Sequence, residues 1–133
     1  MSAMYDVVTL SVNINRNLRE VYDFLSVPEN FPKWASGLGK ALTPAGAEWM
    51  ADGPQGPVKV KFTDRNDFGV VDYYVRSNVG AEIYIPMRVI ANGPGSSVIF
   101  TLFRLPSMSE AEFTADADWV RSDLNSLKEL LEP

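Results

Sequence analysis

The 133-residue chain is predicted to be one α+β domain covering residues 1–133, in which a curved antiparallel sheet of seven strands packs on a long C-terminal helix. Two observations lead to this fold class. The middle of the chain alternates apolar and polar residues in short segments between turn residues, which is typical of an antiparallel meander. The last stretch, Ser107–Glu132, repeats apolar residues at helical spacing and needs an apolar surface to pack on. A sheet with its helices on one side is a two-layer α+β arrangement.

The chain begins with a predicted strand, Tyr5–Val12, whose apolar residues share one parity. Two short helices follow it. The first starts at the cap Asn17, which has Glu20 at the spacing of a capping box, and it ends before Pro28. The second is predicted over Pro28–Ala35, with the proline at its first position.

Six further strands are predicted, at Leu38–Thr43, Ala47–Ala51, Val58–Phe62, Phe68–Arg76, Ala81–Ala91 and Ser97–Arg104. A loop rich in glycine and proline, Asp52–Pro57, separates two of them. Pairing Tyr73 with Ile85 gives one consistently apolar face, because a slip by one residue would turn every side chain over. In the next hairpin we place Met87 opposite Phe100.

The predicted C-terminal helix has one apolar stripe and one charged face. Ser107 caps its start, and Glu110 three residues later completes a capping box. The stripe consists of Phe113, Ala117, Val120, Leu124, Leu127 and Leu131. Such a stripe is buried against a partner surface, which the curved sheet provides.

Composition and charge exclude several classes of function. The chain is 46% hydrophobic and 22% charged, with net charge −5 and pI about 4.6, which argues against nucleic acid or an anionic membrane as the main partner. It contains no cysteine and no histidine, so thiolate chemistry, disulfides and histidine-based metal sites are excluded. It has no apolar run of about 18 residues for a membrane span and no evident secretory signal. We expect a cytoplasmic protein with no cofactor, no metal and no assigned catalytic residue.

Two stretches carry a resemblance to a known superfamily. Val21–Trp34, VYDFLSVPENFPKW, has an aromatic-rich helix that leads into Pro-Glu-Asn and then Trp. Phe100–Arg104 and Val120–Lys128 resemble the terminal strand and helix of uncharacterised bacterial members. The chain is similar to the START-like, or SRPBCC, superfamily of polyketide cyclase/dehydrase and lipid-transport-type domains, which includes the Bet v 1-type proteins. The resemblance implies the helix-grip fold and a cavity for an apolar or aromatic small molecule.

The candidate ligand-binding residues come from the two layers that would enclose this cavity. The sheet and its preceding segments supply Trp34, Trp49, Val60, Phe62, Tyr73, Ile85, Met87 and Phe100, and the helix supplies Ala117, Val120, Arg121 and Leu124. Ordinary core packing predicts the same apolar residues. Arg121 either reaches a ligand oxygen from the cavity edge or is a surface cation beside Asp118.

A charged pair in otherwise apolar strands, Asp72 and Arg88, leaves a second question open. In the register above, both side chains point away from the helix and lie on the surface. If the register slips by one residue, they become a buried acid–base pair and a catalytic candidate.

Three functions remain open from the sequence. The first is a hydrophobic small-molecule binder, which requires a cavity of roughly 300 Å³ or more. The second is a cyclase-, dehydratase- or isomerase-type enzyme that works without histidine. The third is an interaction module whose outer sheet face, with Ile99 and Phe103, packs on a partner or on a second copy as a homodimer.

Overall fold

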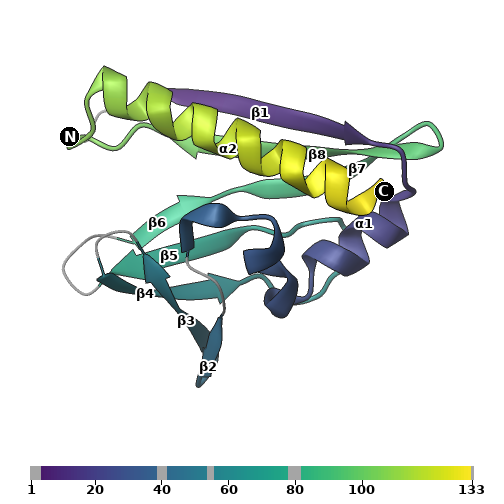
Figure 1. Cartoon of the computed structure of the whole chain (residues 1–133), viewed down its shortest axis with the longest axis horizontal. Coiled ribbons are helices and arrows are strands. Elements are labelled where there is room, and N and C mark those ends of the chain that lie inside the picture. The colour runs from purple at the N-terminus through teal and green to yellow at the C-terminus, as the bar shows by residue number, and fades with distance from the viewer. Residues whose placement is uncertain (1–3, 39–41, 54–55, 78–81, 133) are drawn as a thin grey trace.

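The computed structural model describes residues 4–38, 42–53, 56–77 and 82–132, and its architecture is α+β (Figure 1). Two of its helices, η1 and η2, are 3₁₀ helices. In chain order the elements are β1 (Val7–Ile14), α1 (Leu18–Leu25), η1 (Pro28–Lys33), η2 (Ser36–Leu38), β2 (Thr43–Ala45), β3 (Glu48–Gly53), β4 (Gly56–Phe62), β5 (Tyr73–Ser77), β6 (Glu82–Ile85), β7 (Met87–Asn92), β8 (Gly95–Phe103) and α2 (Glu110–Leu131).

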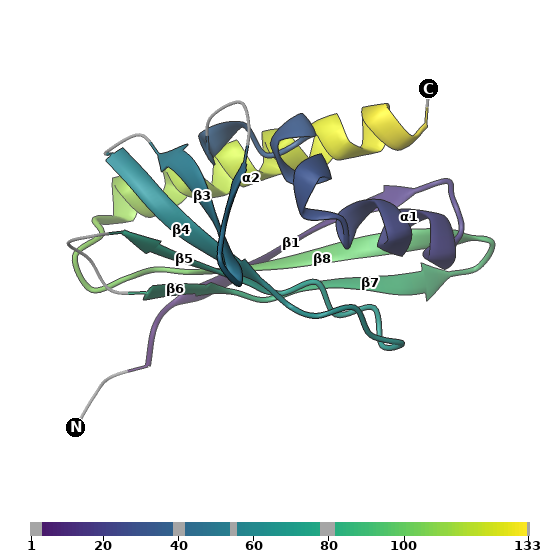
Figure 2. The ribbon, with the colours of Figure 1, turned by 90° about the horizontal axis from the view of Figure 1, so that it is seen from below.

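The strands form two antiparallel sheets, so the prediction of one seven-stranded sheet was wrong. In the described residues one sheet has three strands in the order β1-β8-β7, and the other has five in the order β2-β3-β4-β5-β6. The predicted strand Ala81–Ala91 is interrupted at Pro86, between β6 and β7, which lie end to end in Figure 2. Proline has no N–H to donate to a strand ladder, so the sheet divides there.

Other predicted boundaries also change. The predicted loop Asp52–Pro57 instead continues both strands, because its ends pair across β3 and β4. Only the second half of the predicted strand Phe68–Arg76 is regular strand. The predicted strand Leu38–Thr43 begins in a 3₁₀ helix and ends in β2, and residues 39–41, like Ala81, lie outside the described residues.

The predicted strand register is confirmed in both hairpins. Tyr73 pairs with Ile85 across β5 and β6, and Met87 pairs with Phe100 across β7 and β8. Residues paired directly across two strands point to the same face of a sheet. Tyr73 and Ile85 therefore share one face of the five-stranded sheet, and Met87 and Phe100 share one face of the three-stranded sheet. In both sheets, this is the face turned toward the helices.

Both predicted helices start at a capping side chain, but the cap of the long helix is a different serine from the predicted one. Asn17 Oδ1 accepts a hydrogen bond from the Glu20 amide at 2.9 Å, as predicted. The long helix starts two residues later than predicted, because the capping box uses Ser109 and Glu112 instead of Ser107. Ser109 Oγ accepts from the Glu112 amide at 3.1 Å, and the Ser109 amide donates to Glu112 Oε1 at 2.9 Å.

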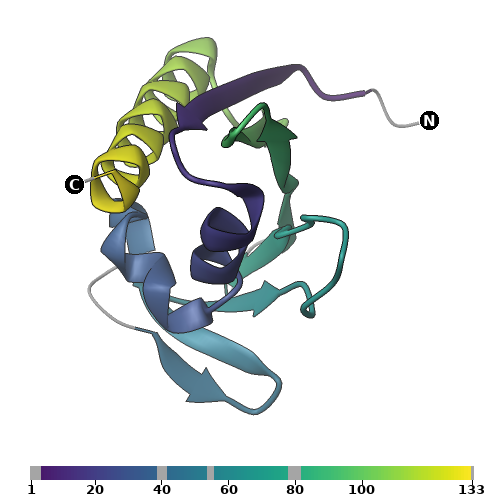
Figure 3. The ribbon, with the colours of Figure 1, turned by 90° about the vertical axis from the view of Figure 1, so that its right-hand side faces the viewer.

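The helices lie on the inner side of the curve that the strands follow from β1 to β2 (Figure 3). α2 packs chiefly against β1, and its predicted stripe is buried at Ala117, Leu124 and Leu127. No helix of the described residues is both long enough and apolar enough to cross a membrane.

An aromatic cluster packs between η1 and strands β4 and β5. The ring of Phe31 makes edge-to-face contacts with Trp34, Phe62 and Tyr73, with ring centroids 5.0–5.4 Å apart. Such contacts leave little empty volume, and the void beside this cluster measures only about 10 Å³. The side of the cluster that faces Leu25, Val71 and Met87 is therefore closely packed.

Candidate functional site

A cavity of about 270 Å³ lies between the middle of α2, the two 3₁₀ helices and strands β5, β6 and β8. Most of its walls are apolar. Its lining residues are Phe31, Ala35, Gly37, Tyr73, Val75, Ile85, Phe100, Leu102, Asp116, Trp119, Val120 and Asp123. The volume is slightly below the roughly 300 Å³ that the binding hypothesis requires, which is the lower end for small-molecule sites.

The strand register builds the floor of this cavity. Tyr73 and Val75 are two residues apart on β5 and therefore face the same side. Ile85 pairs with Tyr73 on β6, and Phe100 and Leu102 repeat the alternation on β8. The floor thus combines strands from both sheets.

Tyr73 provides a polar group in the apolar floor. The residue is 6% exposed, and its hydroxyl has no hydrogen-bond partner among the described residues. Every fully enclosed side-chain nitrogen or oxygen there does have a partner, so this hydroxyl is not fully enclosed by protein atoms, and the residue lines the cavity. Burial, and then the charge of Asp123, raises the pKa of the Tyr73 phenol. It therefore remains protonated at neutral pH.

Asp123 lies at the cavity edge and is held by the 3₁₀ segment. Ser36 donates to it twice, from Oγ to Oδ1 at 2.7 Å and from the amide to Oδ2 at 3.3 Å. Trp119 Nε1 in turn donates to Ser36 Oγ at 2.8 Å. Burial raises the pKa of Asp123, and the hydrogen bonds from Ser36 offset only part of that rise.

Asp116 is the second carboxylate in the lining. Steps of four and three residues place Asp116, Val120 and Asp123 on one face of α2. The Asp116 carboxylate has no hydrogen-bond partner among the described residues. Burial raises its pKa, and the charge of Glu112 one turn earlier adds to the effect. No group of three potential metal ligands occurs in the described part of the chain.

The structure separates the twelve predicted site residues into three groups. Tyr73, Ile85, Phe100 and Val120 line the cavity. Trp34, Val60, Phe62, Met87, Ala117 and Leu124 belong to the packed core or lie against it. Trp49 is half-buried on β3, and exposed Arg121 pairs with Asp118 at 3.1 Å. Neither Trp49 nor Arg121 lines the cavity.

Sequence reasoning missed eight of the lining residues, including both carboxylates. Helical spacing was a usable signal for Asp116 and Asp123, because each lies one turn from the predicted residue Val120. Trp119 gave no such signal, and neither did Ala35, between the two 3₁₀ helices, or Gly37 in the second of them. Their positions depend on how the segment after α1 folds back onto α2.

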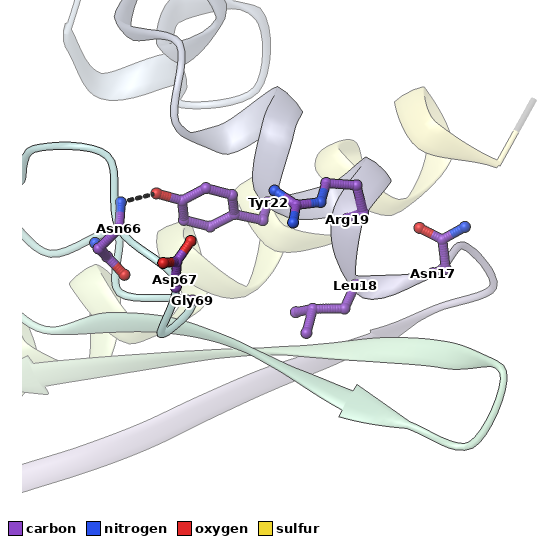
Figure 4. Close-up of a pocket in the computed structure, with 7 residues that line it drawn as sticks. All are labelled: Asn17, Leu18, Arg19, Tyr22, Asn66, Asp67 and Gly69. Carbon is purple, nitrogen blue, oxygen red and sulfur yellow. Dashed lines mark hydrogen bonds between the residues drawn. The ribbon is translucent and has the colours of Figure 1, made fainter.

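Two other depressions in the described surface are larger but are lined differently. One, of about 380 Å³, lies between α1 and the loop at Asn66–Gly69 (Figure 4). Several of its polar residues already have structural roles: Asn17 caps α1, and the Tyr22 hydroxyl accepts a hydrogen bond from the Asn66 amide at 2.7 Å. The other, of about 530 Å³, lies beside the segment before β1 and includes Arg104.

The pair Asp72 and Arg88 lies on the sheet face opposite the cavity. The register did not slip, yet Asp72 is only 7% exposed, so its predicted surface placement was wrong. Its carboxylate is covered because Tyr84 and Arg88 both bond to it on the outer face. Arg88 itself remains about half exposed.

Comparison with solved structures identifies the fold. No protein-family model and no curated protein matches the chain. An uncharacterised protein from Bacillus thuringiensis superposes with a TM-score of 0.77 at 14% identity, over 96% of this chain and 100% of that one. A START superfamily protein from Mycobacterium smegmatis gives 0.74 at 11% identity, over 95% and 97%. The Aha1 dimer from Colwellia psychrerythraea gives 0.72 at 18% identity, over 96% of each chain. The chain therefore has the START-like fold that its sequence predicted.

Proposed function

We propose that the chain binds a small hydrophobic or aromatic molecule in the cavity between α2 and the sheets. The observation that carries this proposal is an apolar cavity with a buried, unpartnered hydroxyl, that of Tyr73, at its floor. An apolar wall with a few polar groups is the usual composition of a small-molecule site. A volume of about 270 Å³ suits a ligand of one or two rings.

The proposed contacts divide into direct and supporting residues. Tyr73, Ile85, Phe100 and Val120 contact the ligand directly, with Trp119 at the rim. The other apolar residues predicted from the sequence support these walls from behind. Trp34, Val60, Phe62, Met87, Ala117 and Leu124 form this supporting set.

Filling the cavity tests the proposal. A neutral two-ring probe, 2-naphthylmethanol, is titrated into the wild-type protein by calorimetry. In Val120→Trp the added indole occupies the cavity, and we expect at least a tenfold loss of affinity, or about 1.4 kcal/mol. Asn125→Trp adds the same group at an exposed position of the same helix and leaves the affinity unchanged.

Two results would overturn the proposal. One is that the wild-type protein does not bind the probe. The other is that both tryptophan variants weaken binding equally while retaining the thermal midpoint of the wild type. Native mass spectrometry of protein purified from its own source then identifies the natural ligand by mass.

A second candidate function is an enzyme of the cyclase, dehydratase or isomerase type. The observation in its favour is that ionisable groups, Tyr73, Asp116 and Asp123, line the cavity. A carboxyl group with a raised pKa is suited to general acid catalysis near neutral pH. If the co-purified molecule is converted to an isomer or dehydrated product, Asp123→Asn should abolish turnover, and exposed Asp118→Asn should retain it. An unchanged molecule after prolonged incubation removes this candidate.

We also propose a homodimer that forms through the outer sheet face. Tyr5 and Ile90 are about half exposed there. Phe103, which was predicted on this face together with Ile99, is half-buried because the rings of Tyr5 and Tyr84 pack against it. One structural neighbour was solved as a dimer.

Sedimentation equilibrium tests this assembly. We expect a dimer for the wild type and a monomer for Ile90→Glu, because a buried unpaired charge is costly in an interface. Ser122→Glu places the same charge on exposed α2 and leaves the dimer intact. A wild-type monomer at high concentration removes the proposal.

A further inference from the structure

We propose that the ligand of this cavity carries a cationic amine beside its apolar body, so that the site selects amphipathic amines over alcohols and acids of the same shape. This inference rests on the proposed binding function and names its ligand class. It follows from the charges that the cavity presents and from the partners that those charges have.

The polar part of the lining is acidic. Asp116 and Asp123 lie seven residues apart on the same face of α2, with Val120 between them. Among the described lining residues there is no lysine or arginine. The neighbouring cation on the helix, Arg121, is exposed and pairs with Asp118, outside the cavity.

The hydrogen bonds of these carboxylates leave their charge unbalanced. Within the described part of the chain, Asp123 accepts only from the neutral hydroxyl and amide of Ser36. Asp116 has no partner among the described residues, and Glu112 one turn away adds a like charge. Partial burial of an anion without a counter-charge is unfavourable, and the raised pKa of both groups reflects that cost. A bound cation would remove it.

The rest of the cavity suits an ammonium group on an aromatic body. An ammonium has up to three N–H donors and no acceptor, and the cavity offers oxygens from two carboxylates and the Tyr73 hydroxyl. That hydroxyl is protonated at neutral pH, and its lone pairs can accept a hydrogen bond. Trp119 and Phe31 add aromatic rings, whose faces attract cations.

An anionic ligand meets the opposite situation. A ligand carboxylate in this cavity would lie near two like charges and would find no cationic partner among the described lining residues. The protein as a whole has a net charge of −5, so its long-range field also repels anions and attracts cations. The expected order of affinity is therefore amine, then alcohol, then acid.

Three probes with the same ring system test this order. Calorimetry at pH 7 and low salt gives the affinities of 2-naphthylmethylamine, 2-naphthylmethanol and 2-naphthoate. We expect the amine to bind at least tenfold more tightly than the alcohol, and the acid to bind more weakly than either. Asp116→Asn and Asp123→Asn should each reduce the amine's advantage over the alcohol several-fold.

A matched control distinguishes the effect of the cavity carboxylates on amine binding from the effect of the protein's net charge. Asp118→Asn removes one negative charge from the same helix, but Asp118 is exposed and outside the cavity. It should leave the preference for the amine intact. If it weakens amine binding as much as Asp123→Asn does, the preference comes from overall charge and the proposal is wrong.

The failure of this inference can be told apart from failure of the binding function. If the alcohol binds and Val120→Trp blocks it, while the amine has no advantage, the cavity binds ligands but does not select amines. If none of the three probes binds the wild-type protein, both proposals fail together.

Discussion

The guanidinium of Arg88 donates two hydrogen bonds to the carboxylate of Asp72, from Nε to Oδ1 and from Nη2 to Oδ2, each at 3.0 Å. The same carboxylate accepts from the Tyr84 hydroxyl and from the Met87 amide, each at 2.7 Å. Asp72 therefore ties the segment before β5 to β6 and β7, on either side of Pro86.

Asp72→Ala should lower the free energy of unfolding by about 2–3 kcal/mol, because the buried Met87 amide and the Tyr84 hydroxyl lose their acceptor. The loss stays below that of a fully buried ion pair, since Arg88 is half exposed and can be hydrated. Urea denaturation measures it. Asp118→Ala breaks an exposed pair with Arg121 and should change stability by less than about 0.5 kcal/mol. Equal effects of the two variants would contradict the structural role of Asp72.

The same carboxylate should make stability depend on pH in acid. Burial tends to raise the pKa of Asp72, but the hydrogen bonds from Arg88, Tyr84 and Met87 outweigh it and lower the pKa. The folded state thus favours the ionised form, which stabilises the protein above the unfolded-state pKa of about 3.9. This contribution is lost as pH falls through the lower folded-state value.

Asp72→Asn removes that titration. The stability difference between the wild type and Asp72→Asn should therefore be constant near neutral pH and shrink below about pH 4. Denaturant titrations across the acid range measure it. A difference that remains constant down to strongly acidic pH would show that Asp72 does not titrate as described.

Leu124→Ala should cost about 2–5 kcal/mol, because it opens a cavity in the packed interface between α2 and the sheets. Leu124 is 1% exposed. Leu130 on the same helix is 42% exposed, and the matched change Leu130→Ala should cost less than about 1 kcal/mol. Similar losses for both would mean that the stripe on α2 faces another direction.

Substituting the two serines before α2 distinguishes the predicted helix start from the observed one. Ser109→Ala removes the side chain that accepts from the Glu112 amide, and it should cost about 1 kcal/mol. Ser107→Ala, at the cap predicted from the sequence, should have little effect because Ser107 lies in an exposed turn. Thermal unfolding of both variants gives the comparison, and the reverse order would support the earlier start.

Gly69→Ala and Gly46→Ala distinguish the energetic cost of a positive φ from the cost of a steric clash. Both glycines have positive φ, 70° and 68°, so alanine pays about 1–2 kcal/mol at either position. A Cβ at Gly69 would also clash with the Val89 carbonyl oxygen, whereas a Cβ at Gly46 would meet no other atom within 4 Å. Gly69→Ala should therefore be clearly the more destabilising in chemical denaturation, and equal losses would show that the loop shifts freely.

Local patterns were sufficient for the helices and the strand register. The stripe on α2 and the pairing of Tyr73 with Ile85 follow from periodicities that each segment carries in itself. The division into two sheets occurs at Pro86, between β6 and β7, and the apolar residues on both sides of this proline resemble one continuous strand. The burial of Asp72 could not be predicted in this way, because it depends on side chains that pack across strands on the outer face.

The cavity itself was predicted only in outline. Met87 and Phe100 are equally suitable for a packed core and for a ligand wall, and backbone curvature decides between the two. The structure places Phe100 at the cavity and Met87 in the core. The two carboxylates of the cavity could have been predicted from the sequence, because Asp116 and Asp123 flank Val120 at helical spacing. The hydrogen bond from Ser36 to Asp123 could not, because it joins residues 87 positions apart.

The break at Pro86 makes the cavity an intersheet space. Tyr73 and Ile85 belong to the five-stranded sheet, and Phe100 belongs to the three-stranded sheet. Backbone hydrogen bonds join the two sheets around this break, from the Val71 amide to the Met87 carbonyl at 2.9 Å and from the Thr101 amide to the Pro86 carbonyl at 3.0 Å. The Asp72 carboxylate accepts from Tyr84 and Met87 on either side of Pro86, so it fixes, from the outer face, the relative position of the two sheets whose inner faces line the cavity.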